Sequence, residues 1–291
     1  MRQYRTPVMD NARWTGFEPR DGDVFVCTPS KCGTTWMQNV VANLLWPDGD
    51  LPGPLFTICP WIEATIMMPA DAMHRMLDAQ THRRAMKSHT PADGIPWFVG
   101  AKYITVARDG RDAFMSWCNH SQRMKIRDEV SARARIEGIE PSVYFDGGDY
   151  GAYFKYWVDH NNFFDVVSTY WARRGQSNLL FAHYNDMKAD LEGEMRRVAE
   201  FLEIELPESK WQAIVERCTF ESMQKSGKAI ADFDRMFEGG TEGFIFKGTN
   251  GRWRDVLTED DLALYRRKVA ETLPSDAARW IEGGRHAIGM R

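Results

Sequence analysis

The sequence has no excess of basic residues, no long apolar run and few cysteines. Its 291 residues carry a formal net charge of −4, which argues against the general electrostatic attraction of a nucleic-acid-binding protein. No stretch approaches the length of about 18 apolar residues that predicts a membrane-spanning helix. The five cysteines lack the spacing of a disulfide framework. We therefore expect a protein that binds neither nucleic acid nor membrane, and any anion site must be a local cluster of charges.

Signals of other special classes are also missing. The segment Met1–Pro7 lacks the apolar core of a secretory signal, so we expect a cytoplasmic protein. The seven histidines are scattered, and no spacing of His and Cys predicts a zinc site. There is no internal repeat, low-complexity tract or linker that would divide the chain. Residues 1–291 are therefore expected to form a single domain, and 43% hydrophobic residues suffice for a sizeable core.

Short apolar runs alternate with segments of helical periodicity. Buried parallel strands are predicted at Val24–Thr28, Ala85–Ser88, Tyr103–Ala107 and Leu179–His183. Helices are predicted, among other places, at Gly33–Trp46, Ala70–Gln80, Asp112–Lys125 and Phe154–Arg174. This alternation predicts an α/β fold, a central parallel sheet flanked by helices. Ligands of such sheets bind beyond the carboxyl ends of the strands, where Lys31, His89 and Arg108 are expected.

Several segments between these elements are rich in turn residues. Trp46–Pro54 and Arg127–Tyr150 combine glycine and proline with charged residues, and both are predicted to be loops. Asp232–Asn250 is glycine-rich and is predicted to be mobile.

The most informative local pattern joins the first predicted strand to the first predicted helix. Here Thr28-Pro-Ser-Lys-Cys-Gly-Thr-Thr-Trp36 forms a short polar loop before a helix, and free backbone N–H groups at a helix N-terminus attract anions. Gly33 permits close backbone approach, Lys31 supplies a positive charge, and Thr34 and Thr35 supply hydroxyls. The loop differs from a standard P-loop, in which the lysine directly follows the second glycine.

This loop resembles the 5′-phosphosulfate loop of the sulfotransferases, usually written TYPKSGTTW. Three further segments resemble motifs of that family in the same order: Lys87-Ser-His-Thr-Pro91, Tyr103–Ser116, and Phe246-Lys-Gly-Thr-Asn-Gly-Arg-Trp-Arg254. Together the motifs span residues 24–254. The resemblance implies a P-loop-like nucleotide-binding core and the donor 3′-phosphoadenosine 5′-phosphosulfate (PAPS). It also implies in-line transfer of the sulfuryl group to a hydroxyl of a small acceptor, leaving 3′-phosphoadenosine 5′-phosphate (PAP).

The same resemblance assigns catalytic roles to three residues. His89, in the Lys-Ser-His-x-Pro motif, matches the general base, and an ordinary imidazole pKa near 6.5 suits that task. Lys31 matches the lysine that binds the bridging and 5′-phosphate oxygens of the donor. Lys87 lies two residues before His89, so both side chains share one face of an extended strand, and Lys87 is expected to meet the sulfuryl group.

Donor binding is assigned in the same way. The loop residues Lys31, Cys32, Gly33, Thr34 and Thr35 are expected around the 5′-phosphosulfate. The 3′-phosphate is expected to contact Arg108, Ser116, Lys247 and Gly248. Adenine and its ribose are expected to contact Trp36, Tyr184 and Phe220. No metal is implied, because lysine, arginine and helix termini neutralise the charge.

Two departures from the family pattern affect the donor site. Cys32 replaces the usual serine, and its place beside Lys31 at a helix N-terminus predicts a reactive thiol. Phe246 replaces the arginine before Lys-Gly, which removes one charge from the expected 3′-phosphate clamp. Arg252 stands where the family usually has an acidic residue. Whether Arg252 compensates for Phe246 is left open by the sequence.

The acceptor is predicted only as a class. Large apolar side chains between the anion motifs favour an apolar or aromatic alcohol: Phe56, Trp61, Ile62, Met67, Met68, Trp97, Phe98, Tyr144, Phe145, Phe163 and Phe164. Two alternative functions remain, a small-molecule kinase with a P-loop-like core and a non-catalytic homologue that kept the nucleotide pocket. The family's dimer motif is only partly echoed at Arg254–Thr258, which leaves the oligomeric state open.

Overall fold

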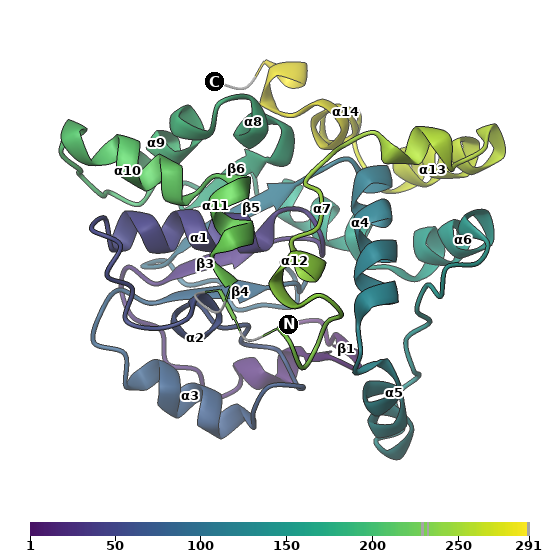
Figure 1. Ribbon diagram of the computed structural model, residues 1–291, viewed down its shortest axis with the longest axis horizontal. Coiled ribbons are helices and arrows are strands. Elements are labelled where there is room, and N and C mark those ends of the chain that lie inside the picture. Colours follow the sequence, from purple (N-terminus) through teal and green to yellow (C-terminus); the bar gives the residue numbers. More distant parts are fainter. Residues whose placement is uncertain (228–229, 232, 290–291) are drawn as a thin grey trace.

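The computed structural model describes residues 1–227, 230–231 and 233–289. Its centre is a parallel sheet with the strand order β4-β3-β5-β6 (Figure 1). The strands are β3 (Val24–Cys27), β4 (Ala85–Ser88), β5 (Lys102–Ala107) and β6 (Leu179–His183). All four predicted strands are confirmed, with single-residue differences at the end of β3 and the start of β5.

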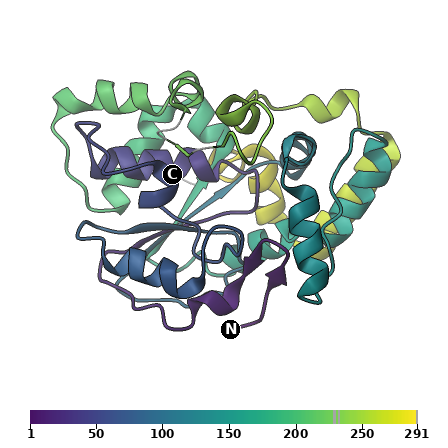
Figure 2. The ribbon, with the colours of Figure 1, turned by 60° about the horizontal axis from the view of Figure 1, so that its bottom comes forward.

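Alternate residues of each strand enter two separate hydrophobic layers. In β3, Val24 and Val26 belong to the layer that contains α1 (Thr34–Leu45), whereas Phe25 belongs to the layer that contains α3 (Ala70–Asp78). Figure 2 shows α1 and α3 on opposite sides of the sheet. Both faces are therefore covered, which explains why β3 is apolar throughout. The predicted α/β fold, with helices flanking a central parallel sheet, is confirmed.

The remaining elements surround this centre. A small antiparallel sheet consists of β1 (Arg5–Thr6) and β2 (Met9–Asp10). Further helices are α2 (Leu55–Ile58), α8 (Tyr184–Ala189), α9 (Leu191–Phe201), α10 (Glu208–Arg217), α11 (Phe220–Lys225), α13 (Glu259–Thr272) and α14 (Ser275–Gly283). Short 3₁₀ helices lie at Asn11–Trp14, Arg252–Asp255 and Arg285–Ile288. In the described part of the chain, no helix has both the length and the apolar character needed to cross a bilayer.

The predicted helix Asp112–Lys125 begins two residues earlier than expected, as α4 (Gly110–Arg123). The Asp109 side chain accepts a hydrogen bond of 2.9 Å from the backbone N–H of Arg111. Aspartate is a favoured residue at this capping position because it satisfies an N–H group that has no partner within the helix. The start of α4 directly after β5 brings this helix to the edge of the sheet where a ligand is expected.

The prediction of one continuous helix at Phe154–Arg174 is wrong. The structure has two helices, α6 (Tyr150–His160) and α7 (Phe163–Trp171). Asn161 breaks the run, since its side-chain oxygen accepts a hydrogen bond of 2.9 Å from the backbone N–H of Phe163. Asparagine competes in this way with regular helical bonding. The break leaves Asn162 free to reach toward the site.

The loop predicted at Arg127–Tyr150 is also wrong in part, because α5 (Arg127–Ile136) lies within it. Val130 and Ala134 are buried and four residues apart, so they lie on one face of the helix. Of the glycine-rich segment Asp232–Asn250, Asp232 lies outside the described residues, while α12 (Gly240–Phe244) forms a short helix. The mobility of this segment stays a prediction.

The sheet topology determines where a ligand can bind. The next two strands of the chain, β4 and β5, lie on opposite sides of β3. Where the strand order reverses in this way, a crevice forms beyond the carboxyl ends of the strands. Lys31 follows β3, His89 follows β4 and Arg108 follows β5. The three predicted site residues therefore come to the same edge of the sheet.

Candidate active site

The loop between β3 and α1 has the backbone geometry of an anion site. Lys31 and Gly33 both have positive φ angles, 68° and 100°. A Cβ atom at Gly33 would lie 3.0 Å from the Tyr184 ring, so both conformation and close packing require glycine here. Among the described residues, no side chain caps the start of α1. Its first N–H groups are thus available to an anion.

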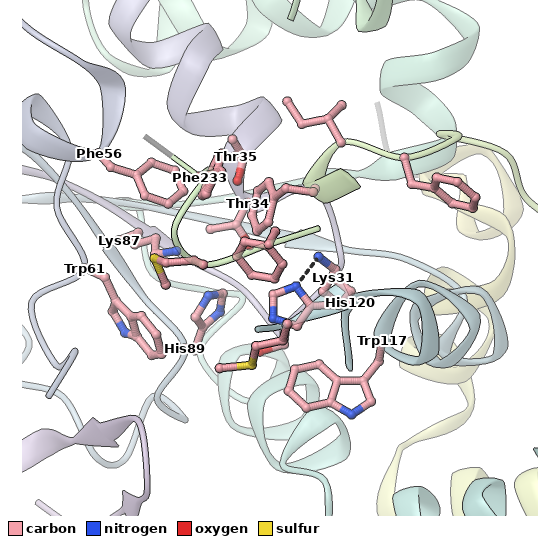
Figure 3. Close-up of a pocket in the computed structure, with 18 of the residues that line it drawn as sticks. Lys31, Thr34, Thr35, Phe56, Trp61, Lys87, His89, Trp117, His120 and Phe233 are labelled. Carbon is pink, nitrogen blue, oxygen red and sulfur yellow. Dashed lines mark hydrogen bonds between the residues drawn. The ribbon is translucent and has the colours of Figure 1, made fainter. Parts of the chain in front are cut away.

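Lys31 places its ammonium group inside a largely apolar cavity (Figure 3). Its Nζ atom lies 3.2 Å from Nδ1 of His120 and 4.6 Å from the centre of the Phe244 ring. Burial, followed by the charges of Lys87 and Arg108, lowers the pKa of Lys31 to about 7. Like charges gathered in an apolar site favour the binding of an anion, which would relieve their repulsion.

Lys87 and His89 enter the same cavity from the end of β4 (Figure 3). The ammonium group of Lys87 lies 4.8 Å from the ring centre of Phe56 and 5.0 Å from that of Trp61. Burial lowers the pKa of Lys87 to about 8. The two lysines and the histidine are thus brought together, as the sequence predicts.

His89 is held in a defined orientation. Its Nδ1 atom lies 2.8 Å from the carbonyl oxygen of Thr28, and because a carbonyl oxygen only accepts, Nδ1 carries the proton. Asn162 donates to the backbone carbonyl of His89 at 2.9 Å. The lone pair of the neutral ring is therefore on Nε2. Burial and the charge of Lys87 lower the pKa of His89 to about 3, so the free protein holds this imidazole neutral.

Aromatic rings form the other end of the cavity. Trp36 donates from its indole nitrogen to the carbonyl of Cys218 at 2.7 Å and meets Tyr184 edge to face at 5.3 Å. The Phe220 ring packs against Gly248, where a Cβ atom would come within 2.7 Å. The sequence-predicted residues that line the cavity are Lys31, Gly33, Thr34, Thr35, Trp36, Lys87, His89, Tyr184, Phe220 and Gly248.

Four of the residues predicted to bind PAPS do not line this cavity. Arg108 is buried with its guanidinium 4.2 Å from the centre of the Tyr184 ring, and it donates to Asn250 and to the carbonyl of Thr249. Lys247 is exposed and Ser116 is half-buried on α4. The contacts of Arg108 nevertheless join β5 to the C-terminal motif, so the two predicted 3′-phosphate segments lie side by side.

The fourth, Cys32, is wrongly predicted as a reactive thiol. Its side chain is fully buried, with Sγ 3.7 Å from the carbonyl oxygen of Ser30. Burial raises the pKa of the Cys32 thiol to about 12. Desolvation opposes the thiolate more strongly than Arg108 and Lys31 favour it, and an inert thiol follows. The backbone of Cys32 still belongs to the anion loop.

We expect slow modification of every thiol in the folded protein, because all five cysteines are buried. A thiol-reactive disulfide reagent should label less than one thiol per chain rapidly in the native state, and five after denaturation. Mass spectrometry of partly labelled protein would locate any fast site. Rapid stoichiometric labelling of Cys32 would contradict its burial.

Phe246 contacts two arginines in a second pocket, which adjoins the first because Phe246 lines both. Its ring centre is 4.7 Å from the Arg123 guanidinium and 5.8 Å from that of Arg252. Nε of Arg252 is buried without a hydrogen-bond partner in the described structure. Burial and the nearby charge of Arg108 lower the pKa of Arg252. The guanidinium groups of Arg252 and Arg108 therefore lie close enough to repel each other at the predicted 3′-phosphate motif.

The apolar wall differs in part from its prediction. Phe56, Trp61, Met67 and Tyr144 do line the cavity, but others belong to the core: Ile62, Phe145, Phe163 and Phe164. Met68, Trp97 and Phe98 pack against that core. Sequence reasoning missed the residues that complete the wall, which come mainly from α4 and the glycine-rich segment: Trp117, His120, Met124, Phe233, Met236, Phe237 and Phe244.

One signal pointed to part of this missed set. His120 lies four residues after Ser116, which places both on one face of α4. The described residues contain no cluster of three or more His, Cys, Asp or Glu side chains placed to hold a metal ion.

Comparison with known proteins agrees with the site. A family model described as the sulfotransferase domain matches residues 21–274. Glycolipid sulfotransferase of Mycobacterium bovis is 32% identical over 311 residues, covering 97% of this chain and 94% of the relative. Human sulfotransferase 1C2 is 27% identical, covering 88% of this chain and 86% of the relative.

Solved structures show the same fold. Mouse sulfotransferase SULT7A1, complexed with PAP, has a TM-score of 0.73 at 20% identity, covering 95% of this chain and 92% of that one. Retinol dehydratase in a complex with retinol and PAP has a TM-score of 0.66 at 21% identity, covering 92% and 87%. The family model, the relatives and the order of the four motifs lead to one conclusion: this chain belongs to the sulfotransferase family.

Proposed function

We propose that this protein transfers the sulfuryl group of PAPS to a hydroxyl of an apolar or aromatic acceptor, with His89 as general base. One observation carries the proposal: His89, with Nδ1 held 2.8 Å from the carbonyl oxygen of Thr28, lines an apolar cavity that also contains Lys31 and the anion loop. Structures with this fold were solved with PAP, which supports PAPS as the donor.

Donor binding would use the residues that the structure gathers at one end of the cavity. The N–H groups at the start of α1 and the Lys31 ammonium fit the 5′-phosphosulfate. Trp36 and Phe220 offer aromatic faces for adenine, and Tyr184 lies between the loop and Gly248. Arg108 would bind the 3′-phosphate with its planar donor fork, exchanging or sharing its contacts with Thr249 and Asn250.

Transfer requires that the acceptor oxygen and the leaving oxygen lie in line at sulfur. The acceptor hydroxyl gives its proton to Nε2 of His89 while its oxygen forms a bond to sulfur. The bond between sulfur and the bridging oxygen breaks, and PAP leaves with that oxygen. Lys31 and Lys87 stabilise the negative charge that spreads over these oxygens. The negative charge of the bound donor also favours the imidazolium form of His89, so it raises the pKa of His89 toward its ordinary value.

The acceptor half of the cavity favours an apolar molecule. Aromatic and methionine side chains dominate its lining, and such walls bind flat rings or hydrocarbon. The related proteins include a glycolipid sulfotransferase and a structure that contains retinol. A phenol, a steroid or a lipid with a hydroxyl group would therefore fit the proposed class.

Transfer assays with ³⁵S-labelled PAPS would test this proposal. A panel of phenols, steroids, long-chain alcohols and glycolipids should include an acceptor that receives the label. Calorimetric titration should show binding of PAP and much weaker binding of ATP. Phosphoryl transfer from ATP would instead support a kinase. Tight PAP binding without sulfuryl transfer to any acceptor would support a non-catalytic homologue.

The unpartnered Nε of Arg252 predicts that this residue replaces the missing arginine at Phe246. Arg252→Ala should weaken PAP binding by about 10- to 100-fold, the effect of losing a charge-assisted hydrogen bond. Binding of adenosine 5′-phosphate, which lacks the 3′-phosphate, should change little. Phe246→Arg should gain little, since the site already holds two guanidinium groups. If Phe246→Arg instead tightens PAP binding tenfold and Arg252→Ala has no effect, Arg252 does not fill this role.

Donor affinity should depend on pH through Lys31. Its pKa of about 7 in the free protein means that raising the pH above 7 neutralises the ammonium, so anion binding must then take up a proton. PAP affinity should consequently fall between pH 7 and pH 9, and calorimetry in buffers of different ionisation enthalpy should detect proton uptake. In Lys31→Met the slope should become shallower, leaving the titration of Lys87 and of the nucleotide. Equal slopes in both proteins would contradict this origin.

A further inference from the structure

His120 lines the same cavity as His89, Lys31 and Lys87 but takes no part in the transfer proposed for them. It lies on α4, and its Nδ1 atom is 3.2 Å from Nζ of Lys31. Figure 3 shows the His120 ring between Lys31 and His89. Both groups are near enough to lower the pKa of His120. The imidazole therefore contacts Lys31 directly, and in this view its other side faces the proposed general base, His89.

Aromatic contacts hold this ring in place. It stacks on Trp117 at 5.3 Å with an interplanar angle of 22°. Phe237 lies at 4.7 Å and Phe244 at 5.8 Å, measured between ring centres. Phe244 also contacts the Lys31 ammonium. His120 and Lys31 thus share one wall, and the ring has little freedom to turn away.

The contact with Lys31 determines which nitrogen of His120 carries the proton. An ammonium group has three donors and no acceptor, so Nδ1 of His120 must accept. Burial and the neighbouring charges lower the pKa of His120 well below its usual range, which keeps the ring neutral. The proton of a neutral ring is then on Nε2, and His120 presents an N–H donor away from Lys31. His89 shows the opposite arrangement, with its Nε2 as an acceptor.

We propose that His120 positions Lys31 through Nδ1 and donates a hydrogen bond from Nε2–H to the oxygen of the acceptor hydroxyl. This inference rests on the proposed function. A hydroxyl is both donor and acceptor, and the two imidazoles are complementary to it: His89 takes its proton, and His120 donates to its oxygen. The second lone pair of that oxygen stays available for attack on sulfur. His120 thereby couples the position of Lys31, which binds PAPS, to the orientation of the acceptor hydroxyl.

Two substitutions separate this role from simple packing. His120→Gln keeps one acceptor for Lys31 and one donor for the hydroxyl, whereas His120→Phe keeps the aromatic contacts and removes both polar groups. Steady-state kinetics should show a loss of roughly 10- to 100-fold in kcat/KM for the acceptor in His120→Phe, with PAP affinity changed much less. His120→Gln should recover most of the loss. Equal activity of His120→Phe and the unaltered protein, or a greater loss in His120→Gln than in His120→Phe, would overturn the proposal.

A spectroscopic experiment tests the same inference without turnover. In protein labelled with ¹⁵N-histidine, the signals absent from His120→Gln belong to His120. They should report the neutral tautomer with the proton on Nε2 at pH 6, and the Nδ1 signal should shift in Lys31→Met. A proton on Nδ1, or no response to Lys31→Met, would overturn the proposal even in an active enzyme. Absence of sulfuryl transfer in the unaltered protein would instead count against the proposed function.

Discussion

Replacing His89 by alanine should lower kcat by about 10²–10⁴-fold, the usual effect of losing a general base. The imidazole would act on the acceptor proton, not on the donor, so PAP affinity should remain within a few-fold of the original value. Steady-state kinetics with saturating PAPS and calorimetric titration with PAP would measure the two effects separately.

The control must account for the structural contact of this histidine. His89 donates from Nδ1 to the carbonyl of Thr28, which precedes the anion loop, and alanine removes that bond. His89→Asn can still donate to Thr28 but cannot take a proton, so it should be as inactive as His89→Ala. His160→Ala on the exposed end of α6 should behave like the unaltered protein. Near-normal turnover of His89→Asn would exclude the imidazole as the base.

Lys31→Met should damage donor binding and turnover together. The ammonium group meets negative charge both in bound PAPS and in the transition state. We expect about 10- to 100-fold weaker PAP binding and a further loss of about 10²–10³-fold in kcat. Methionine keeps much of the apolar stem, so packing against Phe244 should change little.

The two parts of this effect need separate measurements. Calorimetry with PAP gives the ground-state part, and single-turnover transfer at saturating PAPS gives the part specific to the transition state. Lys155→Met, on an exposed position of α6, is the matched control and should change neither. An effect confined to the KM of the acceptor would show that Lys31 does not contact the donor.

The sequence by itself predicts the central sheet and the position of the anion loop. The ends of Ala85–Ser88 and Leu179–His183 are predicted correctly. Leu179–His183 shows the reason, because a buried parallel strand is typically a short, mostly apolar run. The anion loop was equally readable, since Lys31, Gly33 and the first turn of α1 are neighbours in the chain. Local patterns of this kind need no knowledge of distant contacts.

The ends of helices are harder to predict, because they depend on interactions that the apolar periodicity does not show. The apolar periodicity of Phe154–Arg174 continues through the break at Asn161, where the backbone turns extended and the side chain accepts a hydrogen bond from the N–H of Phe163. The helix α5 is amphipathic, but its charged residues and the following glycines indicate a loop. At Asn161 a local side-chain interaction outweighs the average pattern, whereas α5 is stabilised by the burial of Val130 and Ala134.

Tertiary structure alone decided the chemistry around the loop. Cys32 has the sequence context of a reactive thiol, but packing buries it, and desolvation raises its pKa. His120 lies 89 residues from Lys31, yet the two are in contact. The charges of Arg252 and Arg108, from distant parts of the sequence, come close enough to interact. Burial and the distances between segments far apart in the chain depend on how the whole structure packs. Sequence therefore predicts which groups are present, whereas packing decides which of them meet and which remain charged.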